Sequence, residues 1–220
     1  MKLSKTKQYA VITGDVVGSS KLPPDERKKL LSVLKRSALS AQKASGNAVP
    51  EDIVIYRGDS WQLLVTDPSL AVRVGLLLRA AFKAGWGKGK IDTRFAIGVG
   101  TIDFIPSGSI SGGDGEAFRR SGSALERMKK NNRMYISLSD DTMERTVNVI
   151  LYLIDTLAIR WTGKQAQAVM GGLQGLTQEK IAKLWKPRIH QQAVNKHLER
   201  AGWHSIECAV QYIEKNVKKL

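Results

Sequence analysis

The sequence predicts an α+β domain followed by an all-α domain. Short apolar runs rich in β-branched residues alternate with helical patterns over residues 1–138, in the order β-α-β-β-α-β-α-β. Residues 162–220 contain only helical patterns. A long helical pattern at residues 139–161 begins at the capping pair Asp140-Asp141, and we expect it to connect the two domains.

The strands of the first domain are predicted from apolar runs and from the turn residues between them. Strands are expected at residues 9–13, 53–56, 61–65, 93–101 and 134–138. Arg57-Gly-Asp-Ser60, between the second and third of these runs, has the composition of a tight hairpin turn. The glycine- and serine-rich segment 105–115 is expected to form a loop.

The helices are predicted from apolar side chains at helical spacing. In the first domain helices are expected at residues 24–44, 70–81 and 116–130, the second of them after the capping signal Asp67-Pro-Ser69. In the second domain they are expected at residues 163–173, 177–185, 189–201 and from Ser205 onward.

The charge of the chain favours a polyanionic partner. The net charge is +15, and residues 1–160 hold 25 Lys and Arg against 16 Asp and Glu. Residues 161–220 hold 10 against 4, so the C-terminal quarter is about twice as basic per residue. Nucleic acid is the polyanion that such a surface most often binds. A basic surface without any partner is the alternative.

The cysteine content and the hydropathy pattern predict a cytoplasmic protein without a membrane anchor. Cys208 is the single cysteine, which excludes an internal disulfide and fits a reducing compartment. No apolar run approaches the roughly 18 residues that span a bilayer. The polar start of the chain leads directly into the first predicted strand, so no signal peptide is expected.

Asp15 is the first candidate ligand residue, because it follows a predicted buried strand and stands between two glycines. Glycine lets the backbone approach a ligand closely, and backbone N–H groups at the start of a helix favour an anion. We therefore expect a nucleotide phosphate near Gly14, Val16, Gly18 and Ser19. A carboxylate there supplies a hard oxygen ligand for Mg²⁺ or Mn²⁺. The alternative is that Gly-Asp serves only the geometry of a turn.

Asp59 is the second candidate metal ligand and lies in the predicted hairpin, 44 residues beyond Asp15. If the hairpin lies beside the first strand, the two carboxylates can hold one or two metal ions against a triphosphate. That arrangement is used for in-line displacement at phosphorus. The alternative is a hairpin turn in which Asp59 has no ligand.

These residues resemble the class III nucleotidyl cyclases. Asp15-Val-Val-Gly18, the Gly58-Asp59 hairpin and the strand Phe95-Ala-Ile-Gly-Val-Gly100 are similar to that family's motifs. The resemblance implies a ferredoxin-like βαββαβ core, a metal–nucleotide site and a homodimer. Over nearly the whole chain, Ala10 to Ser19 with Gly115-Glu-Ala-Phe118 and the C-terminal helices resembles the SatD-like family of small bacterial proteins.

The chain departs from the cyclase pattern at the residues that stabilise the transition state. Phe118 and Gly122 stand where the family has Asn and Arg, and Ile55 stands where it has a base-selecting lysine. Arg119 and Arg120 are possible substitutes as catalytic charge stabilisers. The alternative is that these two arginines belong to a solvated helix face.

The C-terminal helices resemble the helix-turn-helix of bacterial regulators, through Thr177-Gln-Glu-Lys-Ile-Ala182 and the pattern of residues 189–201. The second of these helices is expected to expose side chains suited to base edges and phosphates. The candidate contacts to double-stranded DNA are Arg188, Gln191, Gln192, Asn195 and Lys196. A helical cluster used for dimerisation is the alternative.

Two functions therefore follow from the sequence. The first is a ligand-responsive DNA-binding regulator whose cyclase-like domain binds a metal–nucleotide and has lost catalysis. The alternative is an active nucleotidyl cyclase or transferase that makes a signal nucleotide, with the helix-turn-helix as a localising or dimerising module. The absence of the Asn/Arg pair favours the first.

Overall fold

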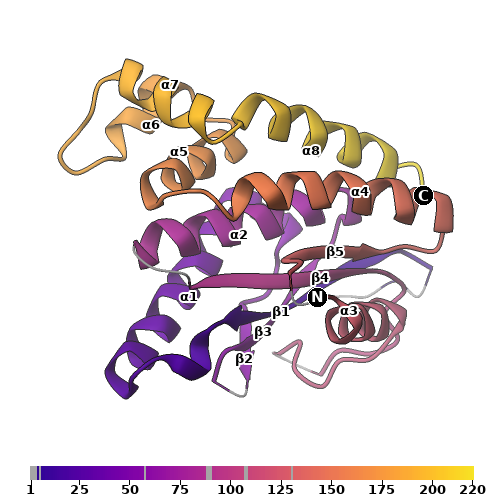
Figure 1. Cartoon of the computed structure of the whole chain (residues 1–220). Helices are drawn as coiled ribbons and strands as arrows, with labels where there is room; N and C mark the ends of the chain where they lie inside the picture. Colours follow the sequence, from indigo (N-terminus) through magenta and orange to yellow (C-terminus); the bar gives the residue numbers. More distant parts are fainter. Residues whose placement is uncertain (1–3, 5, 57, 88–90, 107–108, 130) are drawn as a thin grey trace.

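A mixed β-sheet forms the centre of the computed structural model (Figure 1), which describes residues 4, 6–56, 58–87, 91–106, 109–129 and 131–220. In this part of the chain the strands are β1 (Tyr9–Val17), β2 (Val54–Tyr56), β3 (Ser60–Val65), β4 (Asp92–Gly100) and β5 (Met134–Ser137). The α-helices are α1 (Pro24–Ser45), α2 (Ala71–Trp86), α3 (Glu116–Arg127), α4 (Asp141–Ala158), α5 (Gly163–Leu173), α6 (Gln178–Lys183), α7 (Gln191–Arg200) and α8 (Trp203–Val217). Short 3-10 helices follow β1 (η1, Ser19–Lys21), α1 (η2, Gly46–Ala48) and β3 (η3, Pro68–Leu70).

The strand order is β2-β3-β1-β4-β5. The first four strands pair antiparallel, and β5 adds to β4 in parallel after the crossover through α3. With α1 and α2 between them, β1 to β4 follow the predicted βαββαβ order, so the expected α+β class of the first part of the chain is confirmed. Arg57, which belongs to the predicted hairpin turn, lies outside the described residues.

The sheet has two apolar faces because successive side chains of a strand point to opposite sides. Ala10, Ile12 and Val16 of β1 belong to the large core that includes α1, α2 and α4. Tyr9 and Val11 belong to a smaller cluster with α3. The helix α3 crosses β4 so closely that a Cβ atom at Gly98 would lie 2.3 Å from the carbonyl oxygen of Ala117, so only glycine fits there.

The first strand is longer than the sequence predicts. We expected it to end at Thr13, but it runs to Val17, because the nine-residue β4 pairs with it as far as Val17 opposite Asp92. Asp15 is therefore a strand residue opposite Arg94 and does not follow the strand. The helix predicted over 116–130 ends at Arg127.

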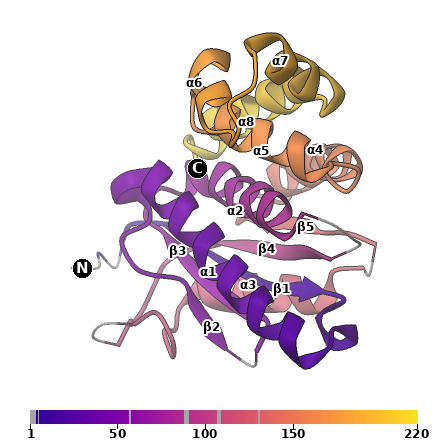
Figure 2. The ribbon, with the colours of Figure 1, turned by 90° about the vertical axis from the view of Figure 1, so that its left-hand side faces the viewer.

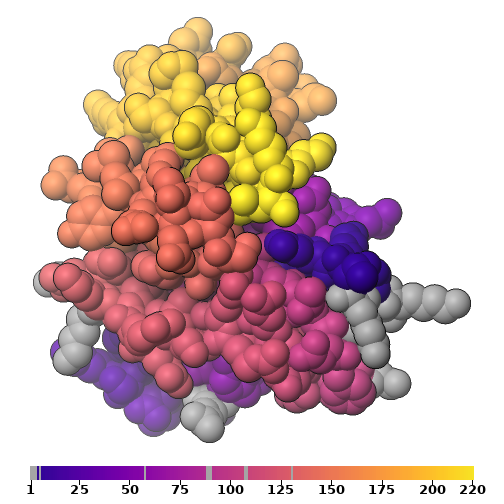
Figure 3. Space-filling model, turned by 90° about the vertical axis from the view of Figure 1, so that its right-hand side faces the viewer, coloured from indigo at the N-terminus to yellow at the C-terminus, as the bar shows by residue number. Residues whose placement is uncertain are grey.

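The C-terminal helices pack on the side of the sheet that α1, α2 and α4 cover. Figure 2 shows α5 to α8 above α2, and Figure 3 shows the C-terminal residues lying over the segment of α4. The large core continues without interruption from β1 to α8, and Arg73 of α2 forms an ion pair of 2.5 Å with Glu214 of α8. The domain boundaries at 138 and 162 stay predictions. No helix among the described residues is long and apolar enough to cross a bilayer.

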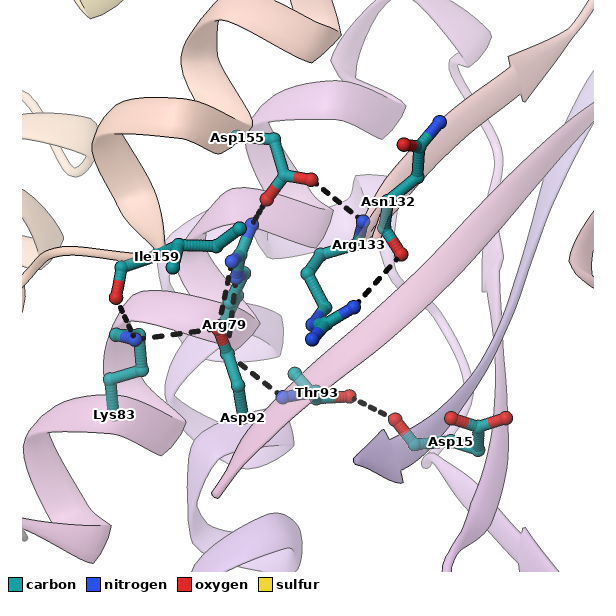
Figure 4. A network of polar contacts seen from close by, with 9 residues as sticks. All are labelled: Asp15, Arg79, Lys83, Asp92, Thr93, Asn132, Arg133, Asp155 and Ile159. Atoms are coloured by element: carbon teal, nitrogen blue, oxygen red, sulfur yellow. Dashed lines mark hydrogen bonds and ion pairs between the residues drawn. The ribbon is translucent and has the colours of Figure 1, made fainter. Parts of the chain in front are cut away.

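A buried polar network joins α4 to α2 and β4 (Figure 4). The fully buried guanidinium of Arg79 donates to both oxygens of Asp92, at 3.1 and 2.7 Å, and to Asp155 Oδ1 at 2.7 Å. Asp155 Oδ2 also accepts from the backbone N–H of Arg133 at 2.7 Å. Because an isolated buried charge is costly, each of these groups depends on its partners.

We expect Asp155→Ala to destabilise the chain strongly. The substitution leaves Arg79 with one carboxylate instead of two and removes the acceptor of a backbone N–H. The free energy of unfolding, measured in urea, should fall by about 3–5 kcal/mol. Glu179→Ala breaks the exposed ion pair with Lys183 and should cost at most about 1 kcal/mol. Equal losses in the two variants would contradict the importance of the network.

Acid should weaken the same network. Burial raises the pKa of Asp92, but Arg79 and Lys83 lower it more, so the pKa lies below its ordinary value of 3.8. The unfolded chain then takes up the proton first, and stability from this carboxylate is lost as the pH falls through the folded-state pKa. Urea unfolding of wild type and Asp92→Asn should therefore show a stability difference that is full above pH 3.8 and shrinks below it. A difference that stays constant with pH would contradict this assignment.

Candidate functional site

The hairpin lies beside the first strand, which was the condition for Asp15 and Asp59 to share a metal ion. Strands β1 and β3 pair antiparallel up to Gly14 opposite Trp61, which brings the hairpin tip beside the turn that follows β1. There the hydroxyl of Ser19 donates a hydrogen bond to Asp59 Oδ2, across 40 residues of sequence. Gly18 enters this turn with φ of 85°, a conformation that side-chain-bearing residues rarely adopt.

A cavity of about 460 Å³ opens at this contact, and we call it the hairpin cavity. Its lining is formed by Ser19, Ser20, Arg27, Leu30, Leu31, Gly58 and Asp59. The guanidinium of Arg27 donates to the carbonyl oxygens of Leu22 and Ser20, at 3.0 and 3.3 Å. No described carboxylate forms an ion pair with it, so its charge is available to an anionic ligand.

Arg94 is a site residue that the sequence analysis missed. Its Nε lies 2.8 Å from Asp15 Oδ1, and its Nη2 lies 2.8 Å from Asp15 Oδ2. The hydrogen bonds to Asp15 raise the pKa of Arg94. The trace of this pair in the sequence is an arginine directly before the apolar run of β4, and nothing local connects it with Asp15.

The two predicted metal ligands therefore have different partners. Both oxygens of Asp15 are held by a cation, whereas Asp59 accepts from a neutral hydroxyl. The described residues contain no group of three or more His, Cys, Asp or Glu side chains suited to a metal ion. Mg²⁺ is commonly held by one or two carboxylates together with substrate phosphates, so Asp59 fits that role as it stands. Asp15 fits it only when Arg94 withdraws.

Of the residues predicted to hold the nucleotide, Gly18 and Ser19 lie at the hairpin cavity or in the turn that forms it. Gly14 lies inside β1, paired with Trp61 on one side and Phe95 on the other. The side chain of Val16 is buried in the large core. Gly14 and Val16 thus contact other parts of the chain where we expected a nucleotide, because β1 extends past both residues.

The arginines proposed as catalytic substitutes have internal partners. Arg119 is exposed and forms ion pairs with Asp103 and Asp114, at 3.3 and 2.8 Å. Arg120 donates to the carbonyl oxygen of Val99 at 2.7 Å and pairs with Glu116 at 2.7 Å. The pairs of Arg119 and the hydrogen bond to Val99 tie α3 to neighbouring segments, whereas the pair of Arg120 with Glu116 lies within α3.

Phe118, which the cyclase resemblance aligns with an Asn, is 8% exposed and packs in the smaller core cluster. The side chain at this position therefore offers no hydrogen-bond donor.

The predicted DNA-contacting residues lie on and before α7. Arg188, Gln191, Gln192 and Lys196 are exposed. Asn195, which we expected to be exposed, is half-buried. Its Oδ1 accepts from Gln178 of α6 at 2.9 Å, and its Nδ2 donates to Glu199 at 2.7 Å.

The solved structures that resemble this chain include two guanylyl cyclases. The crystal structure of the guanylyl cyclase Cya2 matches with a TM-score of 0.47 and 18% identity, over 62% of this chain and 77% of that one. The catalytic core of a rhodopsin-guanylyl cyclase with converted specificity, in complex with ATPαS, matches with a TM-score of 0.46 and 16% identity, over 62% and 80%. Likeness at this level bears on neither the activity nor the ligands of this chain. No family model and no curated protein matches the sequence, so the SatD-like resemblance stays a prediction.

Releasing Asp15 from its cation should improve metal binding. In Arg94→Gln the carboxylate loses a charged partner worth about 1.5–3 kcal/mol, so Mn²⁺ should bind about tenfold more tightly or better. The measurement is the fraction of free Mn²⁺ by electron paramagnetic resonance. Arg145→Gln removes the same charge from an exposed helical position and should leave the affinity unchanged. An unchanged affinity in both variants would show that Asp15 binds no metal.

Proposed function

We propose that the chain is a nucleotidyl-cyclase-like protein that binds a nucleoside triphosphate with Mg²⁺ or Mn²⁺ in the hairpin cavity. The observation that carries this proposal is the Ser19–Asp59 contact, which places a carboxylate beside the turn after β1. The cavity volume of about 460 Å³ suits a nucleotide-sized ligand. No other described cavity joins an acidic hairpin tip to the end of β1.

The lining divides into parts that match the parts of a nucleotide. Asp59 offers an oxygen to the metal ion, and Arg27 offers a positive charge to a phosphate. Leu30 and Leu31 of α1 provide an apolar wall for the base or the ribose. A bound divalent ion would neutralise the phosphate oxygens and favour in-line displacement at phosphorus.

The alternative is that the chain also converts the bound triphosphate to a cyclic product. The residues of α3 bear on how fast this reaction would be. The positions of Phe118 and Gly122 supply no group that stabilises the transition state, and Arg120 is tied to Val99 and Glu116. Catalysis by one copy of the chain would therefore be slow. A homodimer, implied by the cyclase resemblance, would have to bring the missing groups from its second copy.

Metal–nucleotide binding is tested by thermal stability, because a ligand that binds only the folded state stabilises it. Wild type should be stabilised by Mn²⁺ with ATP or GTP, by about 2.7 kcal/mol at a hundred times the dissociation constant. Asp59→Ala should lose most of this gain. Asp52→Ala, which removes an exposed carboxylate near the same hairpin, should keep it.

Equal stabilisation of Asp59→Ala and Asp52→Ala would reject the hairpin cavity as the binding site. Chromatography of the same mixtures then separates binding from turnover. A cyclic product that disappears in Asp59→Ala would establish a cyclase. Unchanged triphosphate together with normal stabilisation would establish a binding domain.

DNA binding is a second candidate function, favoured by the exposure of Arg188, Gln191, Gln192 and Lys196 at one end of the molecule. Neither Arg188 nor Lys196 forms an ion pair with a described carboxylate, so both charges can reach phosphates. Asn195 contributes less than predicted, because its amide bonds within the chain.

The full chain should then bind duplex DNA with an affinity that falls as salt rises. Lys196→Ala should weaken binding to all sequences alike. Gln192→Ala should reduce discrimination between selected and random duplexes by about 1–3 kcal/mol. Fluorescence anisotropy with labelled duplexes measures both effects. If random selection yields no preferred sequence and Lys196→Ala binds as wild type does, α7 is not a DNA-reading helix.

A further inference from the structure

A second polar cavity, of about 470 Å³, lies at the opposite edge of the sheet from the β2–β3 hairpin. It opens between the end of α3, the start of β5 and the middle of α4, and we call it the β5-edge cavity. The side chains that concern its chemistry are Arg127, Lys129, Asn131, Asn132, Tyr135 and Tyr152. The strand order β2-β3-β1-β4-β5 places three strands between β5 and the hairpin strand β2, so this cavity is separate from the hairpin cavity.

The cations of this cavity lack carboxylate partners. Arg127 bonds only the carbonyl oxygen of Ser123 on its own helix, at 3.2 Å, and is exposed. Lys129 is also exposed, and no described Asp or Glu forms an ion pair with either residue. Two unpaired cations beside a hollow attract an anion, most strongly a phosphate.

Two tyrosines supply aromatic surface next to these charges. Tyr152 of α4 is 57% exposed, so its ring is accessible to a ligand. Tyr135 of β5 is held in place by a 2.9 Å hydrogen bond from its hydroxyl to Glu144. The other oxygen of Glu144 accepts from the N–H of Leu138 at 2.7 Å, so this nearby carboxylate is already satisfied.

The two asparagines complete the set with groups that both donate and accept. Asn131 is exposed, and the side-chain amide of Asn132 points away from the buried Arg79 network (Figure 4). An amide of this kind matches the hydrogen-bonding edge of a nucleobase. Cations, an exposed aromatic ring and side-chain amides together are the chemistry that recognises a phosphate, a base face and a base edge.

We propose that the β5-edge cavity binds a free nucleotide without a metal ion, with the base stacked on Tyr152 and the phosphate paired with Arg127 and Lys129. The site lacks a metal-binding carboxylate that is free, since Glu144 is committed to Tyr135 and Leu138. The β5-edge cavity therefore differs from the hairpin cavity in its position, and it needs no metal ion.

The test is calorimetric titration of the full chain with AMP and GMP in the presence of EDTA. Tyr152→Ala removes the stacking surface and should weaken binding about tenfold or more. Arg127→Gln should weaken binding and flatten its dependence on salt. Both side chains are exposed, so the fold should survive, and circular dichroism checks this.

Two control variants match these substitutions. Tyr212→Ala removes an exposed tyrosine of α8, and Arg145→Gln removes an exposed arginine of α4 whose Nε bonds the carbonyl oxygen four residues earlier, as that of Arg127 does. Both should bind as wild type does. Equal affinities of Tyr152→Ala and Tyr212→Ala, or no heat from either nucleotide, would overturn the proposal.

Two further arms separate this site from other ligands and from the hairpin cavity. A single-stranded octanucleotide replaces the free nucleotide, and binding of the octanucleotide alone would overturn a free-nucleotide site. Asp59→Ala should keep metal-free binding, and its loss in that variant would show that the nucleotide occupies the hairpin cavity instead. If Mn²⁺ with a triphosphate does not stabilise the chain, the metal-free titration still tests the β5-edge cavity. The two proposals therefore fail independently.

Discussion

The buried guanidinium of Arg79 is the interaction on which the arrangement of the C-terminal half depends. It is fully enclosed and is neutralised by Asp92 of β4 and Asp155 of α4. A buried charge without its partners costs several kcal/mol, so α4 is confined to the place where Asp155 meets the guanidinium. Since α5 begins shortly after α4 ends, that placement also positions the helices that follow over α2.

The same polar network reaches the central strand β1 on one side and the start of β5 on the other. Asp92 accepts from the N–H of Thr93, whose hydroxyl donates to the backbone carbonyl of Asp15 (Figure 4). On the other side, Asp155 holds the N–H of Arg133, the neighbour of Asn132 at the β5-edge cavity. The network thus lies between the strand of the first candidate metal ligand and the second cavity.

The two acidic residues show how the surroundings decide what a carboxylate can do. Asp15 faces a guanidinium across the β1–β4 ladder, and that cation occupies the positions where a metal ion would bind. Asp59 meets a serine hydroxyl, which leaves its charge uncompensated. In the proposed metal site, Asp59 would therefore be the readier ligand, and Arg94 would compete with the metal ion for Asp15.

The sequence by itself determined the order of the elements and placed most helices to within a few residues, because these follow from local periodicity, caps and turn residues. Asp140 caps α4, and Thr162 forms a capping box at α5, as such local signals allow. Only the tertiary structure decided the partners of Asp15, Arg79 and Asn195, and the extension of β1 to Val17. These depend on strand register and on which helix covers which face. Contacts between distant segments set both, and no pattern within a single segment records them.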